Sequence, residues 1–336
     1  MSPTKAEALD LPSIAVVIPA YRAAPYIAAV IAAIPRLVRH VVVVDDASPD
    51  ELSGVVRGLD EPRVRLLRHD VNRGVGAAVL TGYDEAIALG AEIIVKLDAD
   101  GQMDPAYLLS LVMPIIQGEA DYAKGNRFLH PRELRAMPGS RRYGNAGLSF
   151  LTKLASGYWP VFDPTNGYTA IHASIVPLLD RDAIARRYFF ESSMLLQLSR
   201  VRAVVTDVYI PAVYGGAVSS LSPRWALAEF PPRLLGAFVR RVFTQYFVRD
   251  FTAASLYIVF GLLLVLFGAI WGTWHYIAAS QANVPATTGT VMIAVLPLIL
   301  GAQLLLQAIT IDIQSVPDRP IHPSLRLIEE ADRRHR

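Results

Sequence analysis

Cysteine is absent from this 336-residue chain, which excludes disulfides, thiolate metal sites and cysteine nucleophiles. Charge is scarce as well, because Asp, Glu, Lys and Arg make up only 18% of the residues and the formal net charge is +2. A nearly neutral chain has no global attraction to nucleic acid, so we expect no nucleic-acid partner. The opening residues, MSPTKAEALDLPS, lack the apolar core of a secretion signal, so we expect the chain to begin in the cytosol.

Hydrophobic residues are abundant, at 53%, and two segments without any charged residue account for much of the excess. Residues 253–274 and 290–311 are each long enough, at about 1.5 Å per helical residue, to cross a hydrocarbon layer of roughly 30 Å. Buried core helices are the alternative, but they rarely run this far without interruption. The sequence therefore predicts a transmembrane hairpin with residues 275–289 as its connection.

Arginines flank this hairpin but are missing from its connection. The connection HYIAASQANVPA has neither lysine nor arginine. Arginines precede the first segment at Arg233, Arg240, Arg241 and Arg249 and follow the second at Arg319, Arg326, Arg333 and Arg334. The positive-inside rule places the arginine-rich sides in the cytoplasm. We therefore expect a multi-pass protein of the cytoplasmic (inner) membrane, with the first 220 residues and both termini in the cytoplasm.

Short β-branched runs alternate with helical patterns in the first 220 residues. We expect strands at 14–21, 40–48, 64–70 and 92–100, separated by amphipathic helices. This alternation predicts an α/β domain with a parallel sheet covered on both faces. In such sheets, ligands bind beyond the carboxyl ends of the strands.

A half-apolar stretch that carries several arginines connects the α/β domain to the hairpin. Its pattern suits amphipathic helices that lie in the membrane surface, with a soluble packing helix as the alternative. The predicted organisation is a polar tail (1–12), the α/β domain (13–222), juxtamembrane helices (223–252), a first span (253–274), an extracytoplasmic connection (275–289), a second span (290–311) and a C-terminal tail (312–336).

Two aspartates stand one residue apart where the fourth predicted strand ends, in IIVKLDADGQMDP (93–105). Residues i and i+2 of an extended strand face the same side, so we expect Asp98 and Asp100 to converge. A small set of oxygen ligands suits Mg²⁺ or Mn²⁺, which keeps waters and takes substrate phosphates into its coordination shell. Such an ion would neutralise a departing diphosphate, whereas a solvated Asp-rich turn is the alternative.

Several motifs occur in a fixed order, namely VIPAY, VVDDAS, NRGVGAAVLTGYDEA, KLDADGQMDP and AKGNRF. Together they resemble the family 2 glycosyltransferases. The chain as a whole, including its hairpin, resembles the polyprenyl-phosphate sugar synthases, such as the dolichyl-phosphate mannose and bactoprenol glucose enzymes. This resemblance implies a GT-A fold, which is Rossmann-like with a mostly parallel sheet and helices on both faces. Interfacial helices and a two-helix transmembrane hairpin would follow it.

The resemblance also implies roles for individual residues. The nucleotide-sugar residues would be Pro19, Ala20, Tyr21, Asp45 or Asp46, Lys96, Asp98, Ala99 and Arg127. The metal ligands for Mg²⁺ or Mn²⁺ would be Asp98, Asp100 and Gln102, and the catalytic residues would be Asp163, Glu191 and Asp100. The acceptor phosphate would contact Arg141 or Arg142, Thr165, Ser219, Ser220, Arg240, Arg241 and Arg249.

Several of these residues have a simpler interpretation. Gly74 and Gly76 suit a turn before a helix, and we favour that role over phosphate contact. Asp163 before a proline suits a turn start, and Glu191 suits a solvated helix position. The arginine pair 141–142 suits surface charge.

The chain also departs from the family pattern at two places. Arg22 and Ala23 replace the usual Asn-Glu after the first strand, so a nucleotide contact from that glutamate is missing. Ser219 and Ser220 stand where basic residues often grip phosphate.

The predicted reaction moves a hexose from a nucleotide-diphosphate sugar onto a polyprenyl phosphate (undecaprenyl, decaprenyl or dolichyl), with inversion. UDP-glucose is the first choice of donor and GDP-mannose the second, and a homo-oligomer, a tetramer by family analogy, is expected in the bilayer. A processive polysaccharide synthase is one alternative, but QLSRV (197–201) lacks the tryptophan of its QxxRW element. A non-catalytic nucleotide-binding membrane adaptor is the other, although the DADGQ motif is intact.

Overall fold

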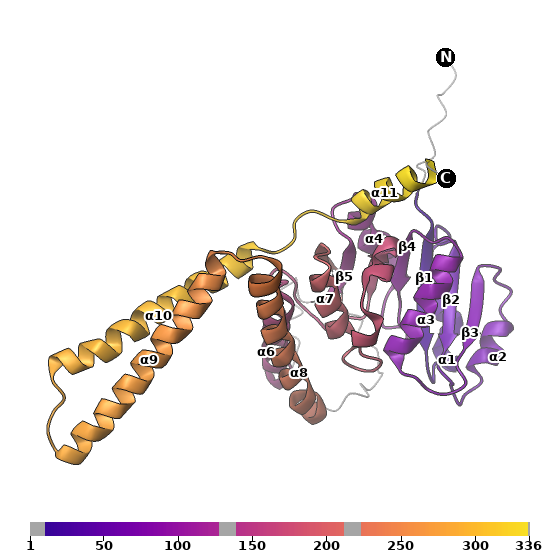
Figure 1. Cartoon of the computed structure of the whole chain (residues 1–336). Coiled ribbons are helices and arrows are strands. Elements are labelled where there is room, and N and C mark those ends of the chain that lie inside the picture. The colour runs from indigo at the N-terminus through magenta and orange to yellow at the C-terminus, as the bar shows by residue number, and fades with distance from the viewer. Residues whose placement is uncertain (1–10, 128–138, 212–222, 335–336) are drawn as a thin grey trace. The chain divides into compact units, whose positions relative to one another are not determined.

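The computed structural model describes residues 11–127, 139–211 and 223–334. The chain forms two compact units (Figure 1). The first comprises Met1–Leu234 together with Pro317–Arg336, and the second is Leu235–Val316.

A seven-stranded sheet organises the first unit. Its strands are β1 (Ile14–Ala20), β2 (His40–Asp45), β3 (Val64–Arg68), β4 (Ile93–Lys96), β5 (Tyr122–Asn126), β6 (Thr169–His172) and β7 (Val205–Tyr209), in the order β3-β2-β1-β4-β6-β5-β7. Neighbouring strands run parallel except at β6, which is antiparallel to β4 and β5. The predicted α/β class with a mostly parallel sheet is confirmed.

Helices cover both faces of this sheet. Helices α1 (Ala24–Ala33), α2 (Leu52–Arg57) and α4 (Leu108–Ile116) share a hydrophobic core with Val16 and Ile18 of β1. Helix α3 (Val75–Ala88) packs on the opposite face, where Gly82 lies directly against Val17. The other elements of this unit are α6 (Gly139–Ser156), α7 (Phe190–Arg200), α11 (His322–Arg334) and the short 3₁₀ turns η1 (Pro105–Tyr107), η2 (Ala173–Leu178) and η3 (Arg181–Ala183).

The first four strands lie where the sequence predicted them, but each ends earlier than expected. The largest difference is at β4, which stops at Lys96, so that Ala99 and Asp100 form a turn and Gly101 follows with a φ of 74°. The prediction that Asp98 and Asp100 share one face of a strand is therefore wrong. The strand ends at Lys96, before both aspartates, and Asp100 lies in the turn that leads to Gly101. Their proximity depends on the turn instead.

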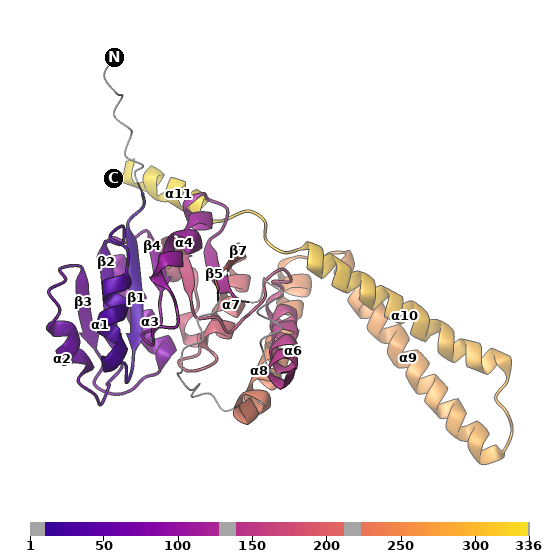
Figure 2. The same ribbon diagram turned by 180° about the vertical axis from the view of Figure 1, so that it is seen from behind.

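The C-terminal segment is fixed to the first unit by the buried Asp121. The Asp121 carboxylate accepts hydrogen bonds from the backbone N–H groups of Ile321 and His322 at 3.0 and 2.9 Å, and Nδ1 of His322 lies 2.8 Å away. The His322 ring stacks on His172 with the ring centroids 4.3 Å apart. Residues 312–336, predicted as a tail, thus include helix α11, which lies beside α4 in Figure 2.

The second unit is a hairpin of two long apolar helices. The last part of α8 (Pro223–Phe243) and a π-helical turn, η4 (Thr244–Arg249), precede α9 (Ala253–Ala282), and α10 (Thr288–Gln314) returns alongside it. The two helices approach closely because their contact residues are small: a Cβ on Gly301 would lie 2.7 Å from the carbonyl oxygen of Gly261.

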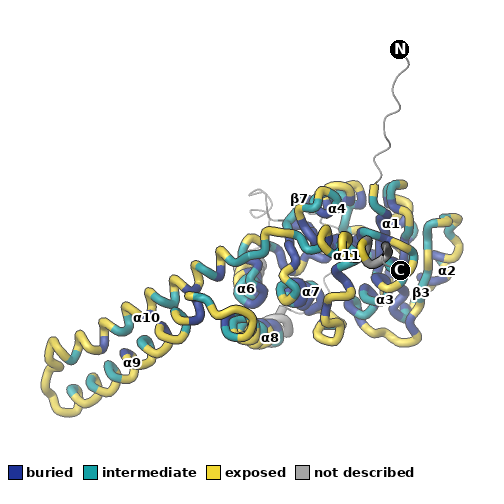
Figure 3. The backbone as a smooth tube through the Cα atoms, turned by 45° about the horizontal axis from the view of Figure 1, so that its top comes forward, coloured by how far each residue is buried: buried dark blue, intermediate teal, exposed yellow. Residues whose placement is uncertain are grey.

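Both hairpin helices are long and apolar enough to cross a membrane, and both extend beyond the predicted spans. Their outward side chains are largely exposed, as the yellow and teal tube of Figure 3 shows. The predicted boundaries of the membrane segments remain predictions.

Candidate active site

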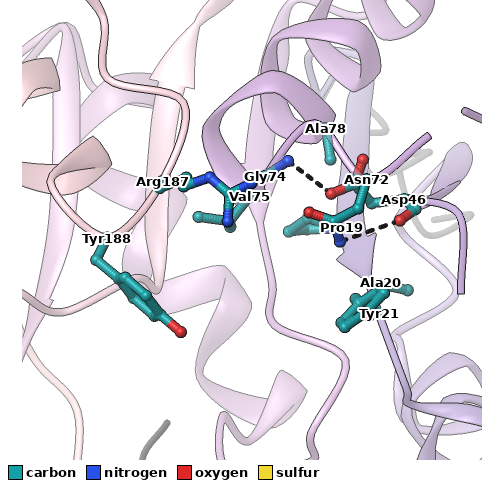
Figure 4. A pocket seen from close by; sticks show the side chains of 10 residues that line it. All are labelled: Pro19, Ala20, Tyr21, Asp46, Asn72, Gly74, Val75, Ala78, Arg187 and Tyr188. Carbon is teal, nitrogen blue, oxygen red and sulfur yellow. Dashed lines mark hydrogen bonds between the residues drawn. The ribbon is translucent and has the colours of Figure 1, made fainter. Parts of the chain in front are cut away.

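A pocket of about 220 Å³ opens where the carboxyl ends of β1 and β2 meet the start of α3. Pro19, Ala20, Tyr21 and Asp46, four of the predicted nucleotide residues, line it together (Figure 4). The remaining lining residues were not selected from the sequence and are Asn72, Gly74, Val75, Ala78, Arg187 and Tyr188. The pocket therefore occupies the edge of the sheet at which open α/β folds bind ligands.

The two adjacent aspartates after β2 have different environments. Asp45 is fully buried, and its carboxylate accepts from the Ser48 N–H and the Ser53 hydroxyl while pairing with Arg68. Asp46 lines the pocket, where its carboxylate accepts from the N–H groups of Arg73 and Gly74. Of the two candidates, only Asp46 is placed to meet a ligand in this pocket.

The glycines of the NRGVG stretch allow another segment to approach the pocket. Gly74 has a φ of 92°, a conformation that favours glycine, and a Cβ there would collide with the carbonyl oxygen of Arg186. A Cβ on Gly76 would collide with the carbonyl oxygen of Ala185. Both glycines thus serve a turn and a close backbone contact, and that contact brings Arg187 to the pocket.

Asp98 and Asp100 follow β4 on the turn described above. The Asp100 carboxylate accepts from the Gln102 N–H at 3.0 Å. Burial, assisted by the charge of Asp98, raises the pKa of Asp100 above its ordinary value, which indicates that the two carboxylates lie near each other. Ala99 between them is buried in the hydrophobic core.

The donor set at this turn fits a hard divalent cation. Within residues 11–127, 139–211 and 223–334, no three His, Asp or Glu side chains form a group that could hold a metal. The predicted ligands are two carboxylates and the Gln102 amide, a small oxygen-only set, and their metal role remains a prediction. Mg²⁺ and Mn²⁺ accept such sets because waters and ligand phosphates complete their coordination.

Lys96, predicted as a nucleotide-sugar residue, is 1% exposed at the end of β4. Its Nζ lies 2.8 Å from Asp98 Oδ1 and donates to Glu191 Oε1 and to the carbonyl oxygen of Gly167, both at 3.2 Å. Burial alone would lower the pKa of Lys96, but the charges of Asp98 and Glu191 outweigh it and raise that pKa. Lys96 is therefore a buried cation that contacts Asp98, Glu191 and the backbone of Gly167.

Asp163 pairs with Arg127, the residue that follows β5. Asp163 Oδ2 accepts from Arg127 Nε at 2.8 Å and Oδ1 accepts from Nη2 at 2.9 Å. The Thr165 hydroxyl donates more weakly to Oδ1, at 3.4 Å. Asp163 is 2% exposed and has a φ of 51°, which is uncommon for a residue other than glycine. With both oxygens paired, this carboxylate is better arranged to orient Arg127 than to remove a proton.

A second buried lysine was missed by the sequence analysis. Lys124 of β5 and Asp207 of β7 are register partners in the sheet, and Lys124 Nζ donates to Asp207 Oδ1 at 3.2 Å and to the Phe162 carbonyl oxygen at 2.6 Å. Asp207 Oδ2 accepts from the Phe162 N–H and from Asn126 Nδ2, each at 2.7 Å. The signal was a charged residue inside each of two short apolar strands, YAKGN and VTDVY.

The predicted acceptor arginines are not gathered at one place within the described residues. Both Nη atoms of Arg241 donate to Asp312 of α10, at 2.7 and 2.9 Å, whereas Arg240 and Arg249 are exposed. All three belong to the second unit. The side chains of Arg141 and Arg142 in α6, and residues Ser219 and Ser220, lie outside the described part of the structure. The acceptor contacts therefore remain predictions.

Comparison with known proteins identifies the family of the chain. Residues 15–177 match the glycosyl transferase family 2. A UDP-N-acetylglucosamine–dolichyl-phosphate N-acetylglucosaminyltransferase of Methanococcus voltae is 32% identical over 189 residues, which cover 52% of this chain and 75% of that protein. An undecaprenyl-phosphate mannosyltransferase of Micrococcus luteus is 28% identical over 204 residues, which cover 56% of this chain and 82% of that protein.

Among solved structures, the mannosyl-3-phosphoglycerate synthase of Rubrobacter xylanophilus matches with a TM-score of 0.53 and 15% identity, covering 72% of this chain and 77% of that one. At this identity the likeness shows a shared fold. The extent of the Methanococcus match shows the family, and the predicted class of enzyme is confirmed. This chain is a glycosyltransferase of family 2.

Proposed function

We propose that this enzyme transfers a hexose from a nucleotide-diphosphate sugar to the phosphate of a membrane polyprenol, with inversion. The observation that carries the proposal is the presence in one chain of a pocket at the carboxyl ends of β1 and β2 and of a hairpin with two apolar helices. A polyprenol stays in the bilayer, so its glycosyltransferase must be held at the membrane. The names of the Methanococcus and Micrococcus relatives specify acceptors of this class, which supports the proposal.

The donor side of the proposal uses the pocket. Tyr21 and Tyr188, each exposed, offer ring faces to a base. The buried Asp46 shapes the pocket because its carboxylate holds the N–H groups of Arg73 and Gly74 and pairs with His69. Arg187 supplies a cation for the diphosphate. UDP-glucose is our first choice of donor and GDP-mannose the second, and the relatives' names add UDP-N-acetylglucosamine to the donors worth testing.

Asp98, Asp100 and Gln102 would hold Mg²⁺ or Mn²⁺, which stabilises the negative charge of a leaving diphosphate when bound. The acceptor has a second phosphate pKa near 6, so it is largely dianionic at neutral pH and needs no strong general base. This chemistry is compatible with Asp163 being committed to Arg127.

The membrane arrangement is also part of the proposal. The first unit precedes α9, and the segment after α10 hydrogen-bonds Asp121 of that unit, so both flanks of the hairpin would lie on one side of the bilayer. The arginine distribution makes this the cytoplasmic side. On α8, Leu235, Val239 and Phe243 repeat every four residues and are 59–60% exposed, as expected of a helix lying in the membrane surface. We expect the enzyme to form a homo-oligomer there.

The test uses detergent-purified protein, undecaprenyl phosphate, Mn²⁺ and a panel of radiolabelled nucleotide sugars, with label followed into the organic phase. Transfer from one donor by the wild type, and none by Asp100→Ala, is the expected result. Binding of a nucleotide without transfer from any donor would contradict the proposal and favour a non-catalytic adaptor.

A further inference from the structure

Two buried lysines hold the two ends of one active-site turn, residues 162–167. Lys124 Nζ donates to the carbonyl oxygen of Phe162, and Lys96 Nζ donates to the carbonyl oxygen of Gly167. We propose that both lysines are positioning residues for the transfer reaction: Lys124 fixes the turn that carries Asp163, and Lys96 couples the same turn to Asp98. The inference rests on the proposed function and adds two residues to it.

At the first end of the turn, the Lys124–Asp207 ion pair binds both backbone groups of one residue. Lys124 Nζ donates to the Phe162 carbonyl oxygen at 2.6 Å, and Asp207 Oδ2 accepts from the Phe162 N–H at 2.7 Å. Lys124 and Asp207 are held in turn by the register of β5 and β7. The peptide groups on either side of Phe162 are thereby fixed to the sheet, immediately before Asp163.

At the other end of the turn, Lys96 Nζ occupies the space that a side chain at position 167 would need. A Cβ on Gly167 would overlap Lys96 Nζ and lie 2.8 Å from Asp98 Oδ2, so only glycine lets the turn rest against both groups. Lys96 also contacts Asp98 Oδ1 and Glu191 Oε1. One ammonium group therefore ties the end of the turn to a predicted metal ligand and to the first turn of α7.

Between its two fixed ends, the turn has a strained geometry that needs support. Asp163 is in the left-handed region with φ 51°, and its carboxylate is paired with Arg127 on both oxygens. The Asn166 N–H donates to the Asp163 carbonyl oxygen at 3.1 Å, which closes the turn. If either end is released, Asp163 can relax and the guanidinium of Arg127 moves with it.

Stability alone does not account for two such lysines. Burying an ammonium group is costly, and a buried ion pair is often no more stable than apolar residues of similar volume. Lys96 of β4 and Lys124 of β5 are both register partners of Thr169, the first residue of β6. The turn 162–167 leads directly into β6. Their common feature is that each reaches the same turn, which favours a role in its placement.

The test compares Lys124→Met, Lys96→Met and the matched control Lys153→Met. Lys153 stands over the Phe162 ring at 5.1 Å, so its removal takes a positive charge from beside the same turn. We expect Lys124→Met to lower kcat about 10–100-fold while leaving unchanged the Kd values for Mn²⁺, measured by electron paramagnetic resonance, and for whichever of UDP and GDP the wild type binds. We expect Lys96→Met to weaken Mn²⁺ binding about 10–100-fold as well, and Lys153→Met to change each quantity less than about twofold.

The double variant Lys124→Met/Asp207→Asn separates positioning from folding. Removing both partners leaves no unpaired buried charge, so its melting temperature should recover toward the wild type while its kcat stays low. Recovery of kcat in step with the melting temperature would overturn the inference, as would equal Mn²⁺ affinity in Lys96→Met and Lys124→Met. A wild type inactive with every donor would reject the proposed function instead, and the Mn²⁺ comparison would still decide whether Lys96 acts on Asp98.

Discussion

In the first unit, Lys96 and Lys124 are almost fully buried and each bonds a carboxylate. Between α9 and α10, by contrast, glycines pack directly against the backbone and the apolar side chains of the other helix. Residues 253–311 contain no Asp, Glu, Lys or Arg at all. Charge returns only at Asp312, which pairs with Arg241. The first unit thus packs its interior around buried ion pairs, whereas the two hairpin helices pack through uncharged residues.

The difference follows from the surroundings that each unit must meet. In the first unit, buried charges fix backbone turns at the edge of a sheet, where a polar ligand can bind. In a hairpin that spans a bilayer, as proposed here, no water would be available to compensate a charge, and helices would associate through small residues that allow backbone contact. We therefore assign the chemistry to the charged residues of the first unit and the membrane attachment to the apolar second unit.

The strongest way to test the first half of this comparison is Asp100→Ala. Loss of a predicted metal ligand should lower transfer by about 10³-fold, roughly 4 kcal/mol, as measured by label entering the organic phase. The melting temperature should change little, because Asp100 lies at the surface and its carboxylate accepts a hydrogen bond from the neighbouring Gln102 N–H. Asp104→Ala is the matched control from the same loop, since Asp104 only caps the turn at Ala106. An equal loss in that control would count against a metal role.

Gly301→Leu tests the role assigned to the second unit, the close contact between α9 and α10. The new side chain would meet the Gly261 carbonyl and the backbone nitrogen of Val265, neither of which can move without separating the helices. We expect a loss of about 3 kcal/mol of stability for the hairpin, measured by thermal aggregation in detergent. Gly236→Ala, on α8 of the same unit, has open space around its new Cβ and should be neutral. A fully stable Gly301→Leu protein would show that the helix contact is not needed.

The pH dependence of the first unit offers a finer test. Burial and the neighbouring His322 lower the pKa of His172 to about 4, compared with about 6.5 in an unfolded chain. Below about pH 6.5 the unfolded chain binds a proton that the folded protein does not, so stability falls as the pH falls toward 4. At pH 5 this loss is about 1–2 kcal/mol. His172→Phe should flatten the melting temperature between pH 6.5 and 5, and an unchanged slope would assign the effect to other groups.

Much of the fold could be predicted from the sequence because local patterns decide it. The β-branched runs placed β1 to β4, and the uncharged segments placed α9 and α10. The ends of elements were less accessible: β4 stops at Lys96 because a turn with Gly101 follows, and periodicity does not report such turns. Helix α11 was missed because its docking depends on Asp121, about 200 residues earlier.

The candidate site was predictable where its residues are consecutive and not where distant segments meet. The ordered motifs contain Asp45, Asp46 and Asp98, and the family resemblance added Asp163; their roles remain predictions. Arg187 reaches the pocket only because Gly74 and Gly76 admit its backbone, which is a contact between segments about 110 residues apart. The Lys124–Asp207 pair likewise depends on sheet order, and nothing in either strand alone indicates its partner.

The most direct measurement compares transfer to two acceptors, undecaprenyl phosphate in a bilayer and a short water-soluble prenyl phosphate, by the wild type, Asp100→Ala and Gly301→Leu. We expect Gly301→Leu to lose transfer to undecaprenyl phosphate and to retain transfer to the short acceptor, whereas Asp100→Ala loses transfer to both. Equal loss of both acceptors in Gly301→Leu, or transfer by Asp100→Ala, would contradict the division of chemistry and attachment between the two units.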